Sequence, residues 1–447
     1  MTDSPHPLSP TATLAPAPSP STSESAREAR RVMQASVVGT TIEFYDFTLY
    51  GFAAVLVFGP QFFPGADPVA GQLGALATFA VGFVMRPLGA VIGGHIGDRL
   101  GRKRVLIGTF LIMGLVTVAI AFIPTYAAIG ILAPILLALL RMVQGLAAGA
   151  EWGGAAVMAV EHAPANKRGL YGIAPALGTT GGIFLAVSVM LLVSVLGPTT
   201  FVEFGWRIAF GLSAVLVVFG VIARRRLTES PLFIKAVEQE PARVPLARLI
   251  RRHPGALLRG VLYILAIAAF GSTVSPYAVG WAVGTLGYSQ DTMLLATAIG
   301  AVVGLALMVL TGRFLDGRRR ARTVIIVMAL LVPVSIAFFP ILSIGGVGAA
   351  ILGLVVGYGA AAACQSTAGS VLTEMFPTDV ALTGVSTAYA LAYCIAGFLP
   401  LAAAAFVAAT GSILPVVVIN VVISLTSLTV AITHFRRKRL AGVVAAP

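Results

Sequence analysis

The stretches GHIGDRLGRKR at residues 94–104 and GRFLDGRRR at residues 312–320 share one pattern and decide the fold class. In each, a glycine at the end of an apolar run is followed four residues later by an aspartate, Asp98 or Asp316, and then by a basic cluster. The two stretches lie about half the chain apart. An internal repeat between long apolar segments is typical of secondary transporters, in which one half of the protein moves against the other.

The composition excludes a soluble protein. Of the 447 residues, 58% are hydrophobic and 11% are charged, whereas soluble domains contain about 45–50% apolar and about 25% charged residues. The apolar content, about 260 residues, is enough for about twelve membrane-spanning helices of roughly 20 residues each. This excludes a soluble enzyme and a protein with a single anchor. The apolar runs are also too long for the roughly ten-residue strands of an outer-membrane barrel.

The apolar runs predict twelve helices, six on either side of a long polar break. They cover residues 34–60, 72–95, 104–123, 128–150, 169–196 and 206–223, then 257–284, 292–312, 322–341, 346–371, 382–409 and 412–435. The fold class predicted is therefore an all-α membrane protein with two six-helix bundles.

The domain boundaries follow from these runs. We predict a disordered N-terminal tail at 1–26, an N-terminal bundle at 27–224, a cytoplasmic central loop at 225–256, a C-terminal bundle at 257–435 and a cytoplasmic tail at 436–447. The first segment is rich in Pro, Ser and Thr, as disordered segments are, and has no apolar core of a signal peptide.

Basic residues set the expected orientation. They gather before the first predicted span, in the loops after spans 2, 4, 6 and 8, and after the last span, whereas the opposite face has only Arg207. Positively charged loops stay in the cytoplasm, so both termini are expected there, and the net charge of +13 does not indicate a nucleic-acid partner. The loop 372–381 is an exception that the sequence does not explain, because it holds Glu374 and Asp379 but no basic residue.

Several motifs resemble the major facilitator superfamily and, within it, the metabolite–proton symporters. They are Ile42–Phe47, Arg86-Pro87-Leu88-Gly89, Leu140–Gly145, Glu151-Trp152-Gly153-Gly154, Glu161–Pro164 and Thr228–Phe233. The match is close over residues 36–235 and looser in the second half, through Asp316 and Glu374–Thr378. Related chains carry basic residues after that Phe-Pro, where this chain has Asp379 and Ala381.

The resemblance implies that the Asp98 loop is a conformational latch, with Gly94, Asp98, Arg99, Gly101, Arg102 and Lys103 as its residues and Asp316 as the counterpart in the second half. A carboxylate in such a loop can cap the N-terminus of a neighbouring helix. Topological anchoring by positive charge is the alternative role.

The charges inside the predicted spans are the main candidate site residues. A charge at a helix centre costs at least about 2.5–3.5 kcal/mol, so it should face the protein interior. Glu43, Asp46 and Tyr50 share one helical face. Arg141, Gln144 and Glu151 share another, and the second span carries Arg86. These residues would form a polar cavity wall, or else internal ion pairs that hold the bundle together. For Glu151, near the end of the fourth span, we expect the structural role.

The second half offers no matching charges within its predicted spans. Its polar candidates are Tyr277, Trp281, Gln365, Tyr389, Tyr393 and Asn420. Aromatic pairs at helical spacing are more often packing residues than site residues. In a cavity they would contact the apolar or hydroxylated part of a substrate.

The function predicted is proton-coupled uptake of a small organic metabolite by alternating access. Buried carboxyl groups near arginines can bind and release protons, and arginine pairs with a carboxylate substrate. The family includes carriers of shikimate-like acids and of di- and tricarboxylates. The alternatives are uptake of an osmolyte such as betaine or proline, and proton-antiport efflux.

We expect no cofactor beyond the proton as coupling ion, no metal and no nucleic acid; the partners are a small-molecule substrate and the lipid bilayer, with no obligate protein partner implied. All five histidines lie outside the predicted span cores, and no Gly-x-x-x-x-Gly-Lys-Ser/Thr segment occurs. Cys364 and Cys394 lie in apolar runs and are expected to be free thiols. The family implies a bacterial cytoplasmic membrane.

Overall fold

The computed structural model describes residues 22–65, 67–100, 102–149, 151–164, 166–225, 245–377, 380–440 and Gly442. Every regular element in these ranges is a helix. Those of the first half are α1 (Thr22–Ala53), η1 (Ala54–Phe58), α2 (Gly59–Phe62), α3 (Pro68–Leu100), α4 (Arg102–Ala121), α5 (Tyr126–Ile129), α6 (Leu132–Ala148), α7 (Trp152–Glu161), α8 (Arg168–Gly172), α9 (Ala174–Ser194), α10 (Pro198–Thr200), η2 (Phe201–Gly205), α11 (Trp206–Gly211) and α12 (Ser213–Arg225).

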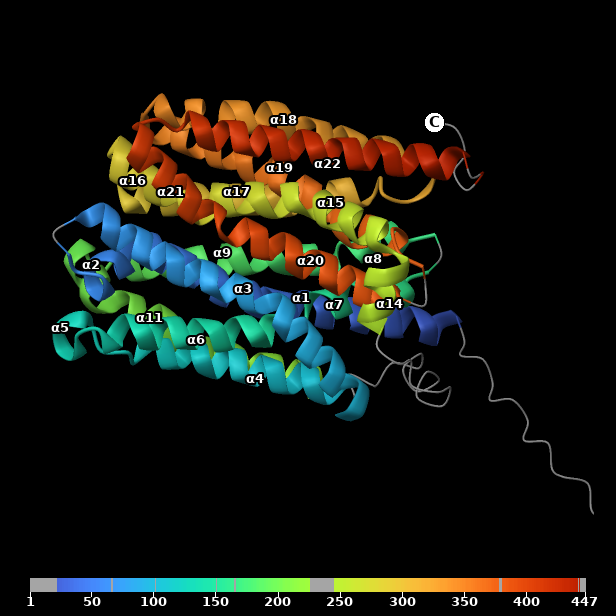
Figure 1. Cartoon of the computed structure of the whole chain (residues 1–447), viewed down its shortest axis with the longest axis horizontal. Coiled ribbons are helices and arrows are strands. Elements are labelled where there is room, and N and C mark those ends of the chain that lie inside the picture. The colour runs from blue at the N-terminus through green and yellow to red at the C-terminus, as the bar shows by residue number, and fades with distance from the viewer. Residues whose placement is uncertain are drawn as a thin grey trace, which may run out of the picture.

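The second half repeats this all-helical organisation. Its elements are α14 (Pro245–Arg252), α15 (Pro254–Ser272), η3 (Thr273–Tyr277), α16 (Ala278–Leu286), α17 (Gln290–Gly312), η4 (Gly317–Arg319), α18 (Arg320–Ser343), α19 (Gly346–Glu374), α20 (Ala381–Gly397), α21 (Leu399–Thr410) and α22 (Leu414–Leu440). The long helices run side by side, with the ends of α1 and α22 that lead to the two termini at the same end of the bundle (Figure 1).

The predicted spans correspond to the observed helices. Within the described ranges, eleven helices are long and apolar enough to cross a membrane, and a shorter apolar stretch, Ile107–Ala121, lies in α4 where the third span was predicted. The prediction of an all-α membrane protein is confirmed. Prolines begin several of these helices, as at Pro68 and Pro254, because the first helical turn does not need the missing N–H.

Two predicted irregular segments contain helix. Helix α1 begins at Thr22 and so includes residues 22–26 of the predicted tail; Ser21 and Glu24 have the spacing of a capping box, which favours a helix start. Helix α14 lies inside the predicted central loop at 225–256. Its sequence is amphipathic, with Leu249 fully buried and Arg251 and Arg252 exposed. Residues 1–21 and 226–244 lie outside the described residues.

Helices within each half pack through glycine. On α3 and α6, a Cβ added to Gly145 would lie 2.0 Å from the Gly82 carbonyl oxygen, and one added to Gly89 would lie 2.0 Å from the Leu146 carbonyl oxygen. In lipid, where burial supplies little driving force between helices, such close backbone approach provides the packing contacts. The α3–α6 seam, defined here by Gly82, Gly89, Gly145 and Gly149, thus fixes the spacing of these two helices.

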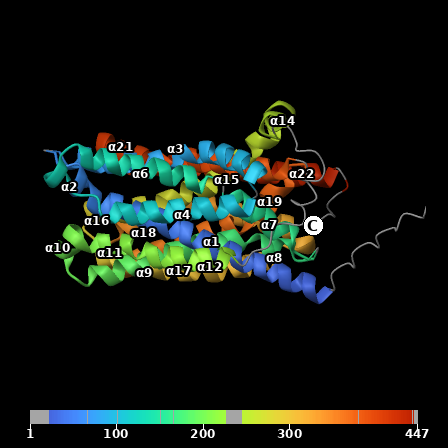
Figure 2. The same ribbon diagram turned by 90° about the horizontal axis from the view of Figure 1, so that it is seen from below.

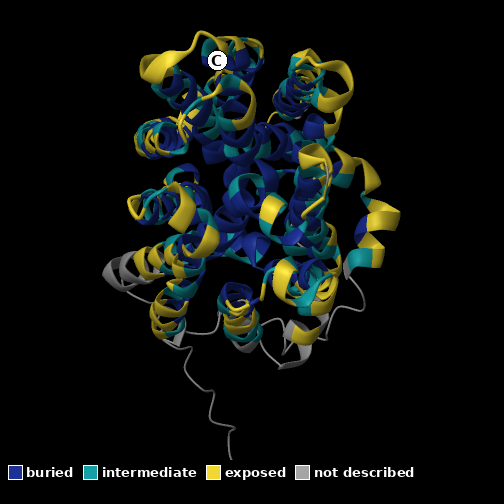
Figure 3. Ribbon diagram, turned by 90° about the vertical axis from the view of Figure 1, so that its left-hand side faces the viewer, coloured by how far each residue is buried: buried dark blue, intermediate teal, exposed yellow. Residues whose placement is uncertain are grey.

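Figure 2 shows the same bundle of side-by-side helices turned by 90°, and Figure 3 shows it from one end. Buried residues gather at the centre, and many exposed residues lie on the outer faces of the helices (Figure 3). The exposed set includes large apolar side chains such as Leu115, Leu192 and Phe219. Apolar side chains on the outside of a helix bundle are suited to contact with lipid rather than water.

The two halves meet along contacts of α20 with α3 and of α17 with α9. The end of the bundle where α8, η4, α14 and the last turn of α22 lie is called the basic end below (Figure 1). Exposed basic side chains there include Lys167, Arg168, Arg251, Arg318 and Arg437.

Candidate functional site

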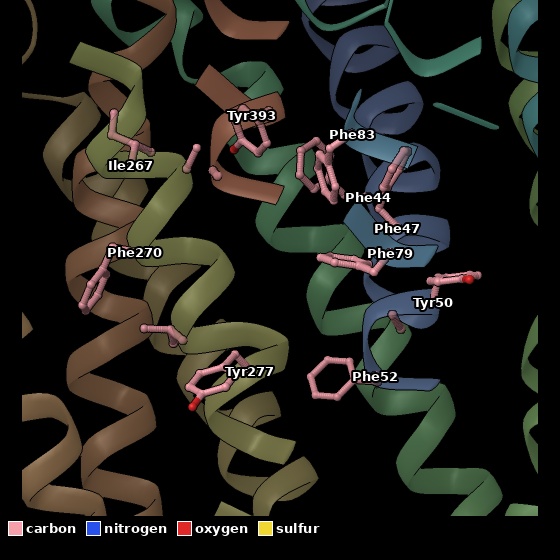
Figure 4. Close-up of a cluster of buried hydrophobic side chains, with 14 of the residues drawn as sticks. Phe44, Phe47, Tyr50, Phe52, Phe79, Phe83, Ile267, Phe270, Tyr277 and Tyr393 are labelled. Atoms are coloured by element: carbon pink, nitrogen blue, oxygen red, sulfur yellow. The ribbon is translucent and has the colours of Figure 1, made fainter. Parts of the chain in front are cut away.

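A cavity of about 100 Å³ lies between the two halves. The first half contributes an aromatic wall of Phe44, Phe47, Phe79 and Phe83, together with Thr48, Thr179 and Thr180. The second half contributes mostly small and polar groups, among them Ser272, Ser275, Tyr358, Gln365 and Tyr393. Figure 4 shows the rings of α1 and α3 facing α15 and α20. Ligand sites usually enclose about 300–1,000 Å³, so this is a contracted site.

Glu43 and Arg86 form an ion pair behind the aromatic wall. The Arg86 Nη2 lies 3.3 Å from the Glu43 Oε1, and the two side chains are 2% and 0% exposed. The pair joins α1 to α3. Two opposite charges buried at this depth stabilise each other, whereas one of them alone would carry a large desolvation cost.

Asp46 and Arg141 belong to a second buried polar group. Ser213 Oγ donates a hydrogen bond of 3.0 Å to Asp46 Oδ1, and the electrostatic neighbourhood of this carboxylate includes Thr117, Arg141 and Glu151. Arg141 donates to Gln144, whose amide in turn donates to Thr117 Oγ1 over 2.8 Å. Helices α1, α4, α6 and α12 all contribute to this group.

Aromatic rings contact both arginines. The Arg86 and Arg141 guanidinium carbons lie 4.0 Å and 4.4 Å from the centroid of the Phe47 ring. Arg141 also lies 4.1 Å from the centroid of Tyr50, whose hydroxyl is 2.6 Å from Thr78 Oγ1. Such cation–π contacts hold the two guanidinium groups in place.

The predicted charged residues therefore lie close together in the structure, but they do not form the cavity wall that was predicted from the sequence. Glu43, Asp46, Arg86, Arg141 and Gln144 are all buried, and none is among the residues that line the cavity. Phe44 and Phe47 of α1 and Phe79 and Phe83 of α3 line the cavity instead (Figure 4). These rings contact the two guanidinium groups. Desolvated charges are stabilised by direct partners and ring faces, so they pack behind the apolar layer.

On the opposite wall, Gln365 and Tyr393 line the cavity as predicted candidates. Tyr393 stacks on Tyr389 with centroids 4.3 Å apart, and Tyr389 stacks on Trp152 of α7. Glu151 is buried and precedes Trp152 at the start of α7, and it does not line the cavity.

Three polar candidates of the second half lie away from the cavity lining. Tyr277 and Trp281 pack edge-to-face against Phe339, with centroids 6.4 Å and 5.3 Å apart. Asn420 donates to the Val416 carbonyl over 3.0 Å and to Thr273 over 3.3 Å. These contacts give all three a packing role in this structure.

At the basic end, Asp316 bridges the two halves. Its carboxylate accepts hydrogen bonds from Gly169 N over 2.7 Å and Leu170 N over 3.1 Å, in the first turn of α8. The N-terminus of a helix favours a negative charge. The other predicted latch residues, Gly94, Asp98, Arg99, Gly101, Arg102 and Lys103, lie outside the residues whose side chains the structure describes.

Glu374 lies in the loop 372–381, which was expected to carry basic residues and has none. The structure provides its basic partners from other helices. Its carboxylate pairs with Arg320 of α18 and Lys438 of α22, and Arg320 also donates to the Ser370 carbonyl over 2.9 Å. One acid thus compensates two cations that are distant in sequence. Asp379 and Thr378 lie outside the described residues.

The aromatic wall was not predicted from the sequence. Its signal was present, because Phe44 and Phe47, like Phe79 and Phe83, recur at helical spacing beside the charged positions. His434, one of the histidines expected outside the span cores, lies in the last two turns of α22 and is buried there. Among the described residues, no group of three or more His, Cys, Asp or Glu side chains could hold a metal ion.

The family model of the Major Facilitator Superfamily matches residues 37–400. The chain belongs to this superfamily. Members of the major facilitator superfamily are membrane transporters rather than enzymes, and this chain is accordingly a multi-pass membrane transporter.

Relatives in the major facilitator superfamily are bacterial transport proteins. The inner membrane metabolite transport protein YhjE of Escherichia coli (strain K12) is 40% identical over 370 residues, covering 81% of this chain and 84% of the relative. The shikimate transporter of the same strain is 41% identical over 280 residues, covering 62% and 63%. The proline/betaine transporter of Salmonella typhimurium is 33% identical over 390 residues, covering 84% and 77%.

Solved structures with this major facilitator fold include the proton:xylose symporter XylE bound to 6-bromo-6-deoxy-D-glucose. Its TM-score is 0.71 at 17% identity, with 92% of this chain and 96% of that chain covered. A partially occluded inward-open form of XylE from Escherichia coli has a TM-score of 0.67 and covers 92% and 98%. At this level of identity the likeness establishes the shared fold.

Proposed function

We propose that this transporter takes up a small organic carboxylate together with a proton by alternating access. The observation that carries the proposal is a group of four buried charged residues on α1, α3 and α6, Glu43, Asp46, Arg86 and Arg141, beside a cavity between the two halves. Charges at this depth are costly and mark functional sites in membrane proteins.

The charge balance of this set links a proton to an anion. Within these four residues, two negative and two positive charges sum to zero when both acids are ionised; Glu151, which is also buried, has interactions of its own at the start of α7 and is not part of this sum. One proton on an acid leaves a net charge of +1, which the carboxylate of a substrate would neutralise. Proton and anion therefore bind more tightly together than apart, and the coupling acts equally in both directions.

We propose that Asp46 is the acid that binds the coupling proton. Glu43 is paired with Arg86 at 3.3 Å, so neutralising it would leave a buried arginine uncompensated. Asp46 accepts a hydrogen bond from the neutral hydroxyl of Ser213 and can lose its charge with less disruption. Its proximity to Arg141 would transmit the change to the second arginine.

The basic end would face the cytoplasm. Exposed Lys and Arg side chains gather on it, and positively charged segments remain on the cytoplasmic side of a membrane. Asp316 and the Trp152–Tyr389 stack join the halves between the cavity and this end, so the structure would correspond to a state closed toward the cytoplasm.

Osmolyte uptake is the second candidate, and the aromatic wall favours it. Faces of phenylalanine and tyrosine bind quaternary ammonium groups, and five such rings, Phe44, Phe47, Phe79, Phe83 and Tyr393, line the cavity. The two cations directly behind this wall disfavour a positively charged group there, so we place the carboxylate first.

Counterflow in proteoliposomes tests the proposal with shikimate, benzoate, citrate, 2-oxoglutarate, betaine and proline. One proton with one monoanion is electroneutral, so we expect a pH gradient to drive uptake about tenfold per pH unit and a potassium-diffusion potential to have little effect. Asp46→Asn should abolish the gradient-driven part and retain exchange. Uptake of betaine alone, or uptake that ignores the pH gradient in the unmutated protein, would contradict the proposal.

A further inference from the structure

Phe47 has an unusual position among the rings of the cavity. It lines the cavity, and it lies within 4.4 Å of both guanidinium groups. The other rings of the aromatic wall contact one arginine each among the described residues, at longer distances: Phe83 and Phe44 lie 4.8 Å and 5.9 Å from Arg86, and Phe79 lies 5.5 Å from Arg141. Phe47 is thus the side chain that touches the cavity and both cations.

Both arginines hold hydrogen-bond donors that the described residues do not use. The Nε and Nη2 groups of Arg86 and of Arg141 are buried and have no hydrogen-bond partner there. The side chains are 2% and 0% exposed. Arg86 Nη2 gains charge compensation from Glu43 at 3.3 Å, and Arg141 uses Nη1 on Gln144. Unused donors on a buried cation are expensive unless an acceptor reaches them.

We propose that Phe47 covers a carboxylate subsite formed by Arg86 and Arg141, and that the substrate's carboxylate displaces this ring to reach both guanidinium groups. The inference rests on the proposed function and names the chemistry of its site. A carboxylate offers two oxygens to the planar forks of arginine, and such charge-assisted hydrogen bonds are stronger than the cation–π interactions that they would replace. The remaining rings would then contact the apolar body of the substrate.

The cover also accounts for the absence of charge from the cavity lining. While the ring lies over the arginines, no charged side chain of the described residues lines the space, so small ions gain little by entering it. A ligand with an apolar body and a carboxylate can fill the space with its apolar body. Its carboxylate oxygens can then accept hydrogen bonds from the two arginines in place of their contacts with the Phe47 ring. A neutral amide of the same shape can fill the space but cannot supply the charge.

Matched ligand pairs test the subsite. The full chain in lipid nanodiscs is titrated with benzoate and benzamide, and with shikimate and its amide, in unmutated protein, Phe47→Leu and the control Phe79→Leu. Removal of two cation–π interactions corresponds to about tenfold in affinity. Phe47→Leu should therefore tighten acid binding about tenfold relative to amide binding, whereas Phe79→Leu, which loses a single and longer contact with Arg141, should change the ratio of acid to amide affinity much less.

A second measurement does not depend on affinity. Phenylglyoxal labelling, read by mass spectrometry, should modify Arg86 and Arg141 faster in Phe47→Leu, with protection by benzoate or shikimate but not by the amides. Equal shifts for acid and amide in Phe47→Leu, or arginine labelling that the ring does not affect, would overturn the subsite. Failure of the unmutated protein to accumulate any acid under a pH gradient would instead overturn the proposed function.

Discussion

Trp152 and Tyr389 stack face to face across the two halves of the protein, with ring centroids 3.5 Å apart and an interplanar angle of 8°. Trp152 lies at the start of α7 and Tyr389 lies in α20. The stack continues through Tyr393 to the cavity. It therefore forms an aromatic layer between the cavity and the basic end, and this layer must separate whenever the site opens toward that end.

The stack should contribute measurably to closure of the basic end. Aromatic pairs add about 0.5–1.5 kcal/mol beyond their burial, so Trp152→Ala should shift the ratio of open to closed forms by up to about tenfold. Hydrogen–deuterium exchange of Trp152–Glu161 and Ala381–Gly397 should rise in this variant. Tyr389→Phe keeps the stack and serves as the control; equal exchange in unmutated protein and Trp152→Ala would contradict the prediction.

The Glu43–Arg86 pair should behave as a unit. Glu43→Gln leaves a buried guanidinium uncompensated, and breaking such a pair costs about 3–5 kcal/mol. We expect a clear loss of thermal stability in detergent, largely restored in the double variant Glu43→Gln with Arg86→Met. If the single and double variants unfold at the same temperature, the pair does not stabilise the bundle.

Asp316 should hold the two halves together at the basic end. Asp316→Asn weakens two charge-assisted hydrogen bonds, each worth about 1.5–3 kcal/mol when buried and less at this half-buried site. Spin labels at Asn166 and Arg318, with Cys364 and Cys394 replaced by alanine, should report a longer distance in this variant. Asp291→Asn removes an equal charge from the first turn of α17 and should leave that distance unchanged; a change in both variants would argue for a general charge effect.

The α3–α6 seam should tolerate no added methyl group. A Cβ on Gly145 would lie 2.0 Å from the Gly82 carbonyl oxygen, so Gly145→Ala must push the helices apart, and we expect poor expression and loss of transport. In the part of the chain that the structure describes, no atom lies within 4 Å of a Cβ added to Gly108 in α4. Gly108→Ala should therefore raise the free energy of unfolding by about 0.5–1 kcal/mol, because alanine lowers the entropy of the unfolded chain. The measurement is the melting temperature, which should rise. Normal expression and uptake in Gly145→Ala would show that the seam can relax.

The helices and the buried charges could be predicted from the sequence, for physical reasons. A span must be long and apolar, and a charge within it must face inward, so Asp46 and Arg141 stand out against their neighbours. A phenylalanine in an apolar span has no such contrast: nothing local separates Phe47, beside the cavity, from Phe52, which is fully buried elsewhere in the core. The wall between charges and cavity depends on how α1 and α3 rotate against each other.

Contacts between residues that are distant in sequence could not be predicted from the sequence either. Glu374 looked unexplained because Arg320 and Lys438 belong to other helices, and only the packing of α18, α19 and α22 brings them to one carboxylate. The same holds for Tyr277 and Trp281, whose helical spacing favoured packing over a site but did not identify Phe339 as their partner.

The α3–α6 seam also bears on how such a transporter could change its substrate during evolution. Arg86 and Arg141 belong to the two helices whose backbones touch there, and a Cβ on Gly149 would lie 2.0 Å from the Arg86 carbonyl oxygen. Mutations that enlarge side chains along this seam would disrupt the helix pair that carries both arginines. New specificities would therefore arise by substitution of Ser272, Ser275, Tyr358 and Gln365 in the second-half wall of the cavity, while the two buried arginines are inherited unchanged.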